Sequence, residues 1–493
     1  MPNVNISPLS AEDLIDESGS VDLSVATAQP RPMSKGAKLV PLPAALIALF
    51  IFAQMFDYHA LHLATFTPDK LFFLVILLFF GNAALSGRLR SVPWSGTEVC
   101  MVMFATLCTA SYCITNPDAG LENFKWLTTL FNLIVYPFAL YFLVKKTRYR
   151  ARKTIWLLRA MVCIGSYLAF TASFEHYGIN ALVFPKYIVD PHVGIQFGRA
   201  RGPMVGSNPM GEWLVVVFLV TCLIMPFARV FTKILLYGLL LLVTMGIYFT
   251  LTRGAWISFA AAVLITAMLG GKSFGIQSRL IIVVVLVAFF VGAGSKFSFS
   301  GQTLFTRRLN TIDYRLSNNE TTFNMGMANP LTGVGYGSFF SNWERYFGYK
   351  EKQLTVDLTD GNHNTFLGLF ADMGVPGVAL YVALFGFLFR ESLRVRKALD
   401  PRAHLERSLA LTSVCLLTIS VIEAMSGDLR FNPTLNAVTF LFAGITASLK
   451  YAPLIQKKIK RTAASQKDIP WKEAPPELSE ALPSAIPQKG LEW

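Results

Sequence analysis

Long runs of apolar residues recur along the chain and alternate with shorter polar segments. Many of these runs extend for roughly 17 to 25 residues with few or no charges, which is the length that an α-helix needs to cross the hydrocarbon core of a bilayer. Within hydrocarbon every backbone polar group needs a partner inside the protein, and a helix supplies these partners within one segment. The pattern therefore predicts an all-α polytopic membrane protein with about twelve transmembrane helices.

The predicted spans belong to a single transmembrane domain that covers residues 39–451. The first five spans lie at residues 40–56, 71–84, 99–114, 127–144 and 154–174. The later spans begin near Met210, Ile234, Ala255, Leu280, Thr365, Leu409 and Asn436.

The two ends of the chain have a different composition. Residues 1–38 and 452–493 are poor in apolar residues, so they cannot bury enough surface to fold. The first stretch also lacks the pattern of a cleaved signal peptide. We expect both ends to be disordered tails.

Two connections on one side of the predicted bundle are longer than the others. Residues 176–207 lie between spans five and six, and residues 295–364 lie between spans nine and ten. A connection of about 70 residues in a compact protein is usually functional or has structure of its own. The second connection is polar, glycine-rich and aromatic, which predicts a small external cap over the helix bundle.

The net charge of +14 is distributed over alternate connections. One set of connections holds most of the basic residues, with the largest groups in residues 145–153 and 390–407, and more follow the last span. Cytoplasmic loops carry such an excess of Lys and Arg, so this side and both ends of the chain are predicted to be cytoplasmic. Because the charge follows topology, we expect no nucleic-acid partner.

The six cysteines all lie within or at the ends of apolar runs, without paired loop spacings. This placement indicates small buried apolar residues rather than disulfides or metal ligands. We expect no metal and no other cofactor.

Five basic side chains fall on the predicted external side, although the sidedness was derived without them: Arg199, Arg201, Arg253, Arg315 and His363. The sequence LTRGAW around Arg253 joins two apolar runs with almost no loop, so its guanidinium is expected at the membrane edge. Arg199 and Arg201 are two residues apart. In an extended segment their side chains would lie on the same face and could bind one anion together. His363 lies between two asparagines directly before a span.

Each of these residues also has an ordinary explanation. Arg253 would be an interfacial arginine, the loop arginines would be solvated, and a lone histidine would be structural. Their combination favours chemistry, because guanidinium binds phosphate oxygens through paired hydrogen bonds and neutral imidazole takes a proton from a hydroxyl near pH 7. Together they indicate transfer of a group from a phosphate or pyrophosphate to an alcohol.

The stretch NPLTGVGYGSF contains Gly333, Gly335 and Gly337, a spacing that resembles a nucleotide-binding loop. It lacks the preceding strand and the Lys-Ser/Thr pair of such loops, so we expect a tight turn that seats the external segment on the bundle. Glu212 and Asp372 are expected to be buried or interfacial carboxylates that pair with an external arginine or cap a helix.

Four short motifs in this order and on this side resemble the O-antigen ligase and polysaccharide polymerase superfamily of bacterial inner-membrane enzymes. The motifs cover about residues 195 to 390 and include Arg201-Gly202 with Asn208-Pro209, Thr252-Arg253-Gly254, Asn329-Pro330-Leu331 with Gly333 and Gly335, and His363-Asn364 with Leu367.

The resemblance implies a metal-independent glycosyltransferase of the GT-C type in the bacterial inner membrane, with its active site facing the periplasm and a glycan on undecaprenyl pyrophosphate as substrate. Arg201, with Arg199, and Arg253 would then bind the pyrophosphate, with Arg315 as a helper, and His363 would act as the base. A flippase and chain-length or export proteins of the same pathway would be its partners.

Other functions remain open at this point. A twelve-span transporter would carry charges at the midplane of the membrane, and a flippase would line a deep polar cavity, whereas the charges here lie at the external edge. Within the resemblance, polymerisation of repeat units and ligation of finished glycan to lipid A core are both compatible with the motifs. We favour polymerisation, because a long aromatic cap would guide a growing chain.

Overall fold

The computed structural model of the chain describes residues 39–56, 67–115, 130–194, 196–270, 303–346 and 362–451, with only the backbone for residues 303–314 and 340. Both predicted tails, the span expected to begin at Leu280, and residues 295–302 and 347–361 of the predicted cap lie outside these ranges. The predictions for them stay predictions.

The described part of the chain folds as α-helices without a β-strand. Its helices of ten residues or more are α1 (Ala44–Ala53), α2 (Pro68–Leu85), α3 (Gly96–Thr115), α5 (Tyr136–Lys145), α6 (Ala151–His176), α7 (Ser207–Ile224), α8 (Val230–Phe249), α9 (Arg253–Leu269), α11 (Thr303–Ala328), α13 (Thr365–Ala398), α14 (His404–Ser426) and α15 (Pro433–Leu449).

Seven of the described helices are long and apolar enough to cross a membrane, namely α2, α3, α6, α7, α8, α13 and α14. Shorter apolar helices stand beside them, among them α1, α9 and α15. This confirms the predicted all-helical, multi-pass membrane class. The number of about twelve spans stays a prediction.

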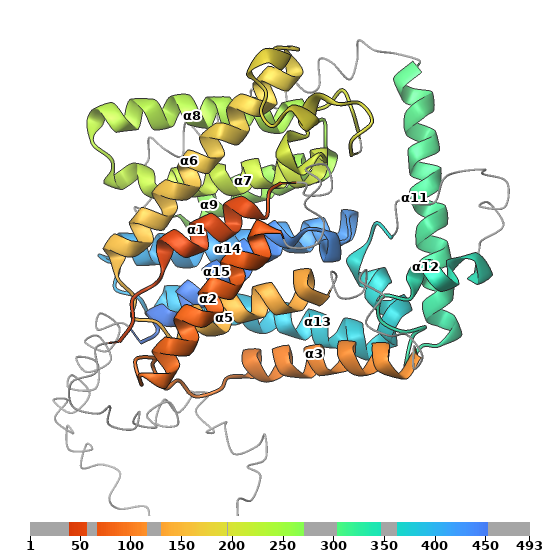
Figure 1. Cartoon of the computed structure of the whole chain (residues 1–493), viewed down its shortest axis with the longest axis horizontal. Coiled ribbons are helices and arrows are strands. Elements are labelled where there is room, and N and C mark those ends of the chain that lie inside the picture. Colours follow the sequence, from red (N-terminus) through yellow and green to blue (C-terminus); the bar gives the residue numbers. More distant parts are fainter. Residues whose placement is uncertain are drawn as a thin grey trace, which may run out of the picture.

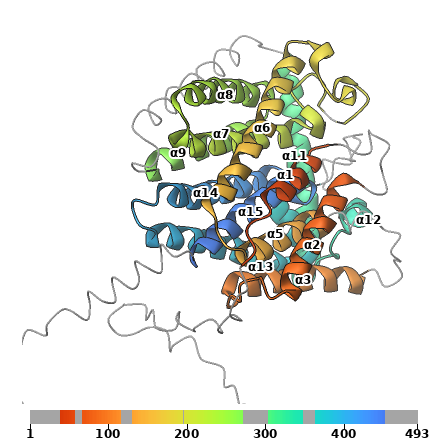
Figure 2. The ribbon, with the colours of Figure 1, turned by 60° about the vertical axis from the view of Figure 1, so that its left-hand side comes forward.

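The helices α7 and α15 form the centre of the bundle. Nearly every residue of each is buried, as expected for a helix that is apolar on all sides and surrounded by others. In both views α7, α8 and α9 lie above α14 and α15, while α6 crosses them obliquely (Figures 1 and 2). The outer helix α2 has most of its apolar surface exposed, which a membrane would cover.

Several helices begin at the same end of the bundle. The starts of α7, α9, α13 and α15 lie there with the ends of α6, α8 and α14, because consecutive helices run in opposite directions. We call this the Arg253 end. The helix α11 stands across this end of the bundle (Figure 1).

Ionic and polar contacts tie helices together at the opposite end. Glu98 at the start of α3 forms an ion pair with Lys145 at the end of α5. The Tyr141 hydroxyl donates to Glu391 of α13 at 2.7 Å. The large basic groups at residues 145–153 and 390–407 also lie at this end, which agrees with the alternation on which the predicted sidedness rests.

The helix α13 is broken near its start, and the glycine-rich turn at residues 329–337 packs into the break. Gly374 has φ +65° inside the helix. The Val375 N–H donates to the Pro330 carbonyl at 2.8 Å, and the Val334 N–H donates to the Ala371 carbonyl at 2.8 Å. The predicted tight turn against the bundle is therefore confirmed.

Replacing Gly333 with alanine should destabilise the protein. Gly333 has φ +67°, and an added Cβ would lie 2.3 Å from the backbone carbon of Asp372, so both strain and a clash with backbone oppose the change. We expect a loss on the order of 2 kcal/mol, measured as a lower melting temperature in detergent. Gly238→Ala in α8 is the control, because no atom lies within 4 Å of its added Cβ. Equal melting temperatures for the two variants would contradict the fitted turn.

Part of the long connection before α13 is helical. The helix α11 packs on α13 through Phe323, whose ring lies 5.9 Å from that of Phe370. At Gly326 the two helices approach so closely that a Cβ would clash with the Phe370 ring. The long connection thus contains a 26-residue helix anchored to the start of α13.

Candidate functional site

The turn between α8 and α9 carries Arg253 and is fixed to the start of α7. The Thr252 hydroxyl donates to the Ser207 hydroxyl at 3.0 Å. Leu251 has φ +52°, a left-handed conformation that makes the reversal short. The Arg253 side chain is exposed, and among the described residues no hydrogen bond or ion pair engages its guanidinium. It is therefore available to an anionic ligand.

His363 lies directly before α13, in a segment held on both sides. The side chain of Asn364 caps α13 by accepting from the Leu367 N–H at 3.1 Å. The Thr365 hydroxyl donates to the Gly427 carbonyl at 3.1 Å and accepts from the Leu429 N–H at 2.9 Å. These bonds fix the His363 segment against the turn that follows α14. The His363 side chain itself is partly exposed.

The end of α14 connects the two segments. Glu423 accepts from the Asn208 side-chain amide at 2.7 Å, and a Cβ added to Gly254 would lie 3.1 Å from the Glu423 carboxylate. Two residues further, the Met425 carbonyl accepts from the Asn364 amide at 3.4 Å. The structure therefore brings the Arg253 and His363 segments to opposite sides of the end of α14, although 110 positions separate the two residues in the sequence.

Helix N-termini add to the positive potential at this end. The first N–H groups of a helix lack partners within the helix, and its dipole places partial positive charge there. Because α7, α9, α13 and α15 all begin at the Arg253 end, several such termini lie around Arg253 and His363. The arrangement suits binding of phosphate groups.

Arg201 is buried and holds its own loop together. Its guanidinium donates to the carbonyls of Val193 at 2.7 Å, Ile188 at 2.6 Å and Asp190 at 3.1 Å. Burial lowers the pKa of this guanidinium below its ordinary value, against the opposing effect of the nearby Glu175 and Asp190 carboxylates. In this conformation Arg201 organises the loop rather than presenting a fork to solvent.

Arg199 and Arg201 do not face the same way. Arg199 is exposed whereas Arg201 is 1% exposed. Ala200 between them donates its N–H to the Phe249 carbonyl at 3.1 Å, and Arg201 has φ −107° and ψ −29°, which is not extended. The expectation that both side chains grip one anion assumed an extended segment, and that assumption is wrong here.

Arg315 lies in the middle of α11, where its side chain is half-buried. Across the described ranges, no hydrogen bond or ion pair links it to the segments that carry Arg253 and His363. The contact of Phe323 with Phe370 anchors the C-terminal part of α11, beyond Arg315. The structure thus does not join Arg315 to the other candidates.

A buried ion-pair network supports the His363 segment, and the sequence revealed only one member of it. Arg430 forms ion pairs with Asp372 of α13 and, at 2.6 Å, with Asp428. Although burial lowers it, the pKa of Arg430 is raised well above its ordinary value by the Asp428 and Asp372 carboxylates. Of the two roles expected for Asp372, pairing with an arginine or capping a helix, the structure shows the pairing. Arg430 itself was not foreseen, because its partner lies 58 positions away in the sequence.

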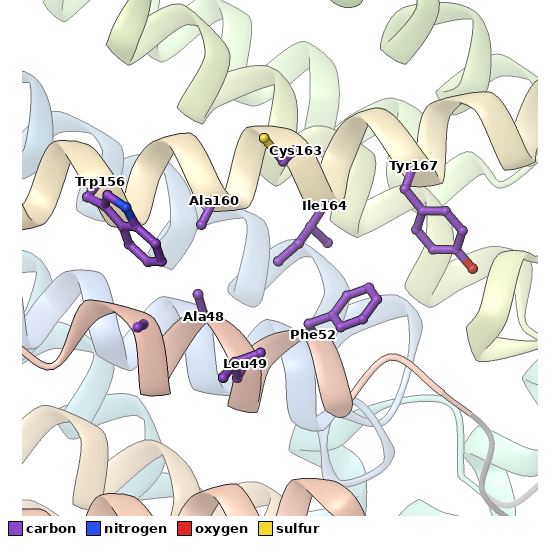
Figure 3. Close-up of a pocket in the computed structure, with 9 residues that line it drawn as sticks. Ala48, Leu49, Phe52, Trp156, Ala160, Cys163, Ile164 and Tyr167 are labelled. Atoms are coloured by element: carbon purple, nitrogen blue, oxygen red, sulfur yellow. The ribbon is translucent and has the colours of Figure 1, made fainter.

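Within the described ranges, no group of three or more His, Cys, Asp or Glu side chains lies close enough together to hold a metal ion. One apolar groove of about 600 Å³ lies between α1 and α6, away from the Arg253 turn (Figure 3). It is lined by Ala45, Ala48, Leu49, Phe52, Trp156, Ala160, Cys163, Ile164 and Tyr167. Its lining is apolar apart from the Cys163 thiol and the Tyr167 hydroxyl, and that hydroxyl donates to the Phe184 carbonyl at 2.7 Å.

A family model described as O-antigen ligase matches residues 237–382 of the chain. The match begins in α8 and ends in α13, so it includes Arg253, Arg315 and His363, whereas Arg199 and Arg201 precede it. A search of curated proteins found no match. The resemblance that rested on short motifs thus has independent support, since residues 237–382 are similar to the O-antigen ligase family.

Proposed function

We propose that this protein polymerises oligosaccharide repeat units carried on undecaprenyl pyrophosphate into a surface polysaccharide, at the periplasmic face of a bacterial inner membrane. The observation that carries the proposal is the meeting of three features around the end of α14: a guanidinium that no described residue engages by a hydrogen bond or ion pair, a histidine, and several helix N-termini. A long multi-pass domain suits a substrate whose carrier stays in the bilayer.

In the proposed reaction, a hydroxyl of the acceptor sugar attacks the anomeric carbon of the donor, and the bond from that carbon to the pyrophosphate oxygen breaks. His363 takes the proton from the attacking hydroxyl. Arg253 and the nearby helix N-termini stabilise the negative charge that develops on the leaving pyrophosphate. Because the donor brings its own leaving group, the reaction takes no nucleotide, and we propose that it takes no metal.

The remaining predicted site residues have different parts in the proposal. Arg199 is exposed on the loop that also holds Gln196, whose side chain accepts from the first N–H of α7 at 3.2 Å, and we propose it as a second contact for the pyrophosphate. Arg201 is proposed to position this loop through its three carbonyl contacts. Arg315 is proposed to meet the substrate only beyond the first sugar, because α11 stands across the bundle end (Figure 1).

Ligation of a finished glycan to lipid A core is the second candidate, and the description of the matching family favours it. The two reactions share the donor and the pyrophosphate site but differ in the acceptor. We favour polymerisation because the segment before α13 is long and forms α11, a largely polar helix beside which a growing glycan would pass.

Deleting the gene tests the function and separates the two reactions. For a polymerase, the surface polysaccharide should be lost and single repeat units should accumulate on the lipid carrier. Accumulation of finished polymer on the carrier would instead establish a ligase. An unchanged surface glycan, with no lipid-linked intermediate, would contradict both.

A further inference from the structure

The apolar groove between α1 and α6 opens on the outside of the described bundle, where a membrane would cover it. Figure 3 shows its length along α6, from Trp156 at one end to Tyr167 at the other, with Ala48, Leu49 and Phe52 of α1 opposite. Leu49 is 45% exposed and Trp156 is 49% exposed, so the groove is open along its side. Its volume of about 600 Å³ lies in the range of pockets that hold one ligand.

The length and direction of the groove suit a single fatty acyl chain. Trp156 and Tyr167 are 11 positions apart on α6, which is about 16 Å of helix and about half of a hydrocarbon core of roughly 30 Å. Because α6 runs towards the Arg253 end, Trp156 lies nearer the opposite end, which carries the large basic groups. A chain that enters at Trp156 therefore belongs to a lipid of the leaflet at the basic end, whereas a polyprenyl chain from the proposed transfer site would enter at Tyr167.

Two exposed arginines flank the Trp156 end of the groove. Arg152 lies four residues before Trp156, and Arg159 lies three residues after it and four before Cys163. Both are thus neighbours of the lining residues on one face of α6. Within the described residues, no hydrogen bond or ion pair engages either guanidinium. An exposed arginine in a membrane span is costly unless its guanidinium reaches the head groups, and tryptophan gathers at that same level.

We infer that the groove binds an acyl chain of an anionic phospholipid, whose head-group phosphate lies between Arg152 and Arg159. The two guanidinium groups complement the negative charge, and each is shaped for paired hydrogen bonds to phosphate oxygens. The lining removes the chain from the bulk lipid. The inference is independent of the proposed glycan transfer, since it uses no residue of that site. Ordinary solvation of the two arginines at the membrane surface would give neither a bound chain nor a preference for anionic lipid.

The preference for an anionic head group is tested with the purified full-length protein in detergent. Native mass spectrometry measures the binding of phosphatidylglycerol and of phosphatidylcholine with the same chains. The wild type should bind phosphatidylglycerol on the order of tenfold more tightly, and Arg159→Gln should reduce this preference about fivefold. Arg394→Gln is the control, because Arg394 is also exposed, lies in the last turns of α13 at the basic end and does not line the groove.

The place of the chain is tested by crosslinking. Phosphatidylglycerol with a photoreactive diazirine in its acyl chain should label the groove peptides of α1 and α6, which include Leu49 and Ile164. Ala45→Phe should remove most of this labelling, because Ala45 is an exposed lining residue and the added ring fills the groove. Val230→Phe should leave the labelling unchanged, because Val230 is 77% exposed at the start of α8 and lies outside the groove.

Equal binding of the two lipids by the wild type would overturn the inference, as would an equal loss of preference in Arg159→Gln and Arg394→Gln. Crosslinks confined to other helices would overturn it as well. If excess undecaprenyl phosphate displaces the photoreactive lipid from the groove, the groove belongs to the polyprenyl carrier and the inference is wrong. Melting temperatures show which variants are folded, and the arginine variants test the head-group contacts even if Ala45→Phe does not fold.

Discussion

Replacing His363 with alanine should abolish glycan transfer while the protein still inserts at normal abundance. The imidazole is the only proposed acceptor for the proton of the attacking hydroxyl, and loss of a general base lowers rates by roughly 10² to 10⁴-fold. The segment that carries it is held by hydrogen bonds of Asn364 and Thr365, which the substitution leaves in place, so the protein should still fold. Transfer is measured with purified protein and a lipid-linked donor, and abundance in membrane fractions.

His404→Ala is the matched control, because His404 lies at the start of α14 at the opposite end of the bundle and is exposed. Both variants should have the same melting temperature in detergent, and only the first should lose transfer. Full activity of the His363 variant would remove the histidine from the mechanism.

Replacing Arg253 with alanine should reduce transfer by about 10² to 10³-fold, because its charge would no longer offset that of the leaving pyrophosphate. Arg253→Lys should show a large defect as well. Lysine keeps the charge but loses the planar fork that makes two parallel hydrogen bonds to phosphate oxygens. Since no hydrogen bond or ion pair engages the guanidinium within the described residues, neither change should lower the melting temperature.

Arg229→Ala provides the comparison for this pair of variants. Arg229 is exposed and directly precedes α8, as Arg253 marks the start of α9, but it lies at the other end of the bundle. If Arg229→Ala impairs transfer as much as Arg253→Ala does, a general effect of surface charge would replace the proposed local one. Wild-type rates in the lysine variant would mean that charge alone suffices.

The proposed site combines groups that are prepared before substrate binds. The Arg253 turn is held by Ser207 and the His363 segment by Gly427, so neither has to be ordered by the ligand. Such preorganisation lowers the cost of placing charge where it develops during reaction.

Arg201 shows that a sequence pattern misleads when its interpretation assumes a particular backbone conformation. Two arginines with one residue between them share a face only in an extended segment. Here the loop turns at Arg201, and the carbonyls of Ile188, Asp190 and Val193 converge on its guanidinium. The local sequence does not indicate which carbonyls accept these hydrogen bonds, because every residue has a backbone carbonyl.

The sequence by itself determined the helical membrane class, the tight turn at residues 329–337 and the segments that carry Arg253 and His363. These follow from local physics, since the bilayer sets the length of apolar runs and glycines mark positive φ. Only the tertiary structure decided which of the candidates lie together. It placed Arg253 and His363 around Glu423, buried Arg201, left Arg315 on α11 and paired Asp372 with Arg430. Such pairings depend on how helices distant in sequence pack, and packing is a property of the whole bundle.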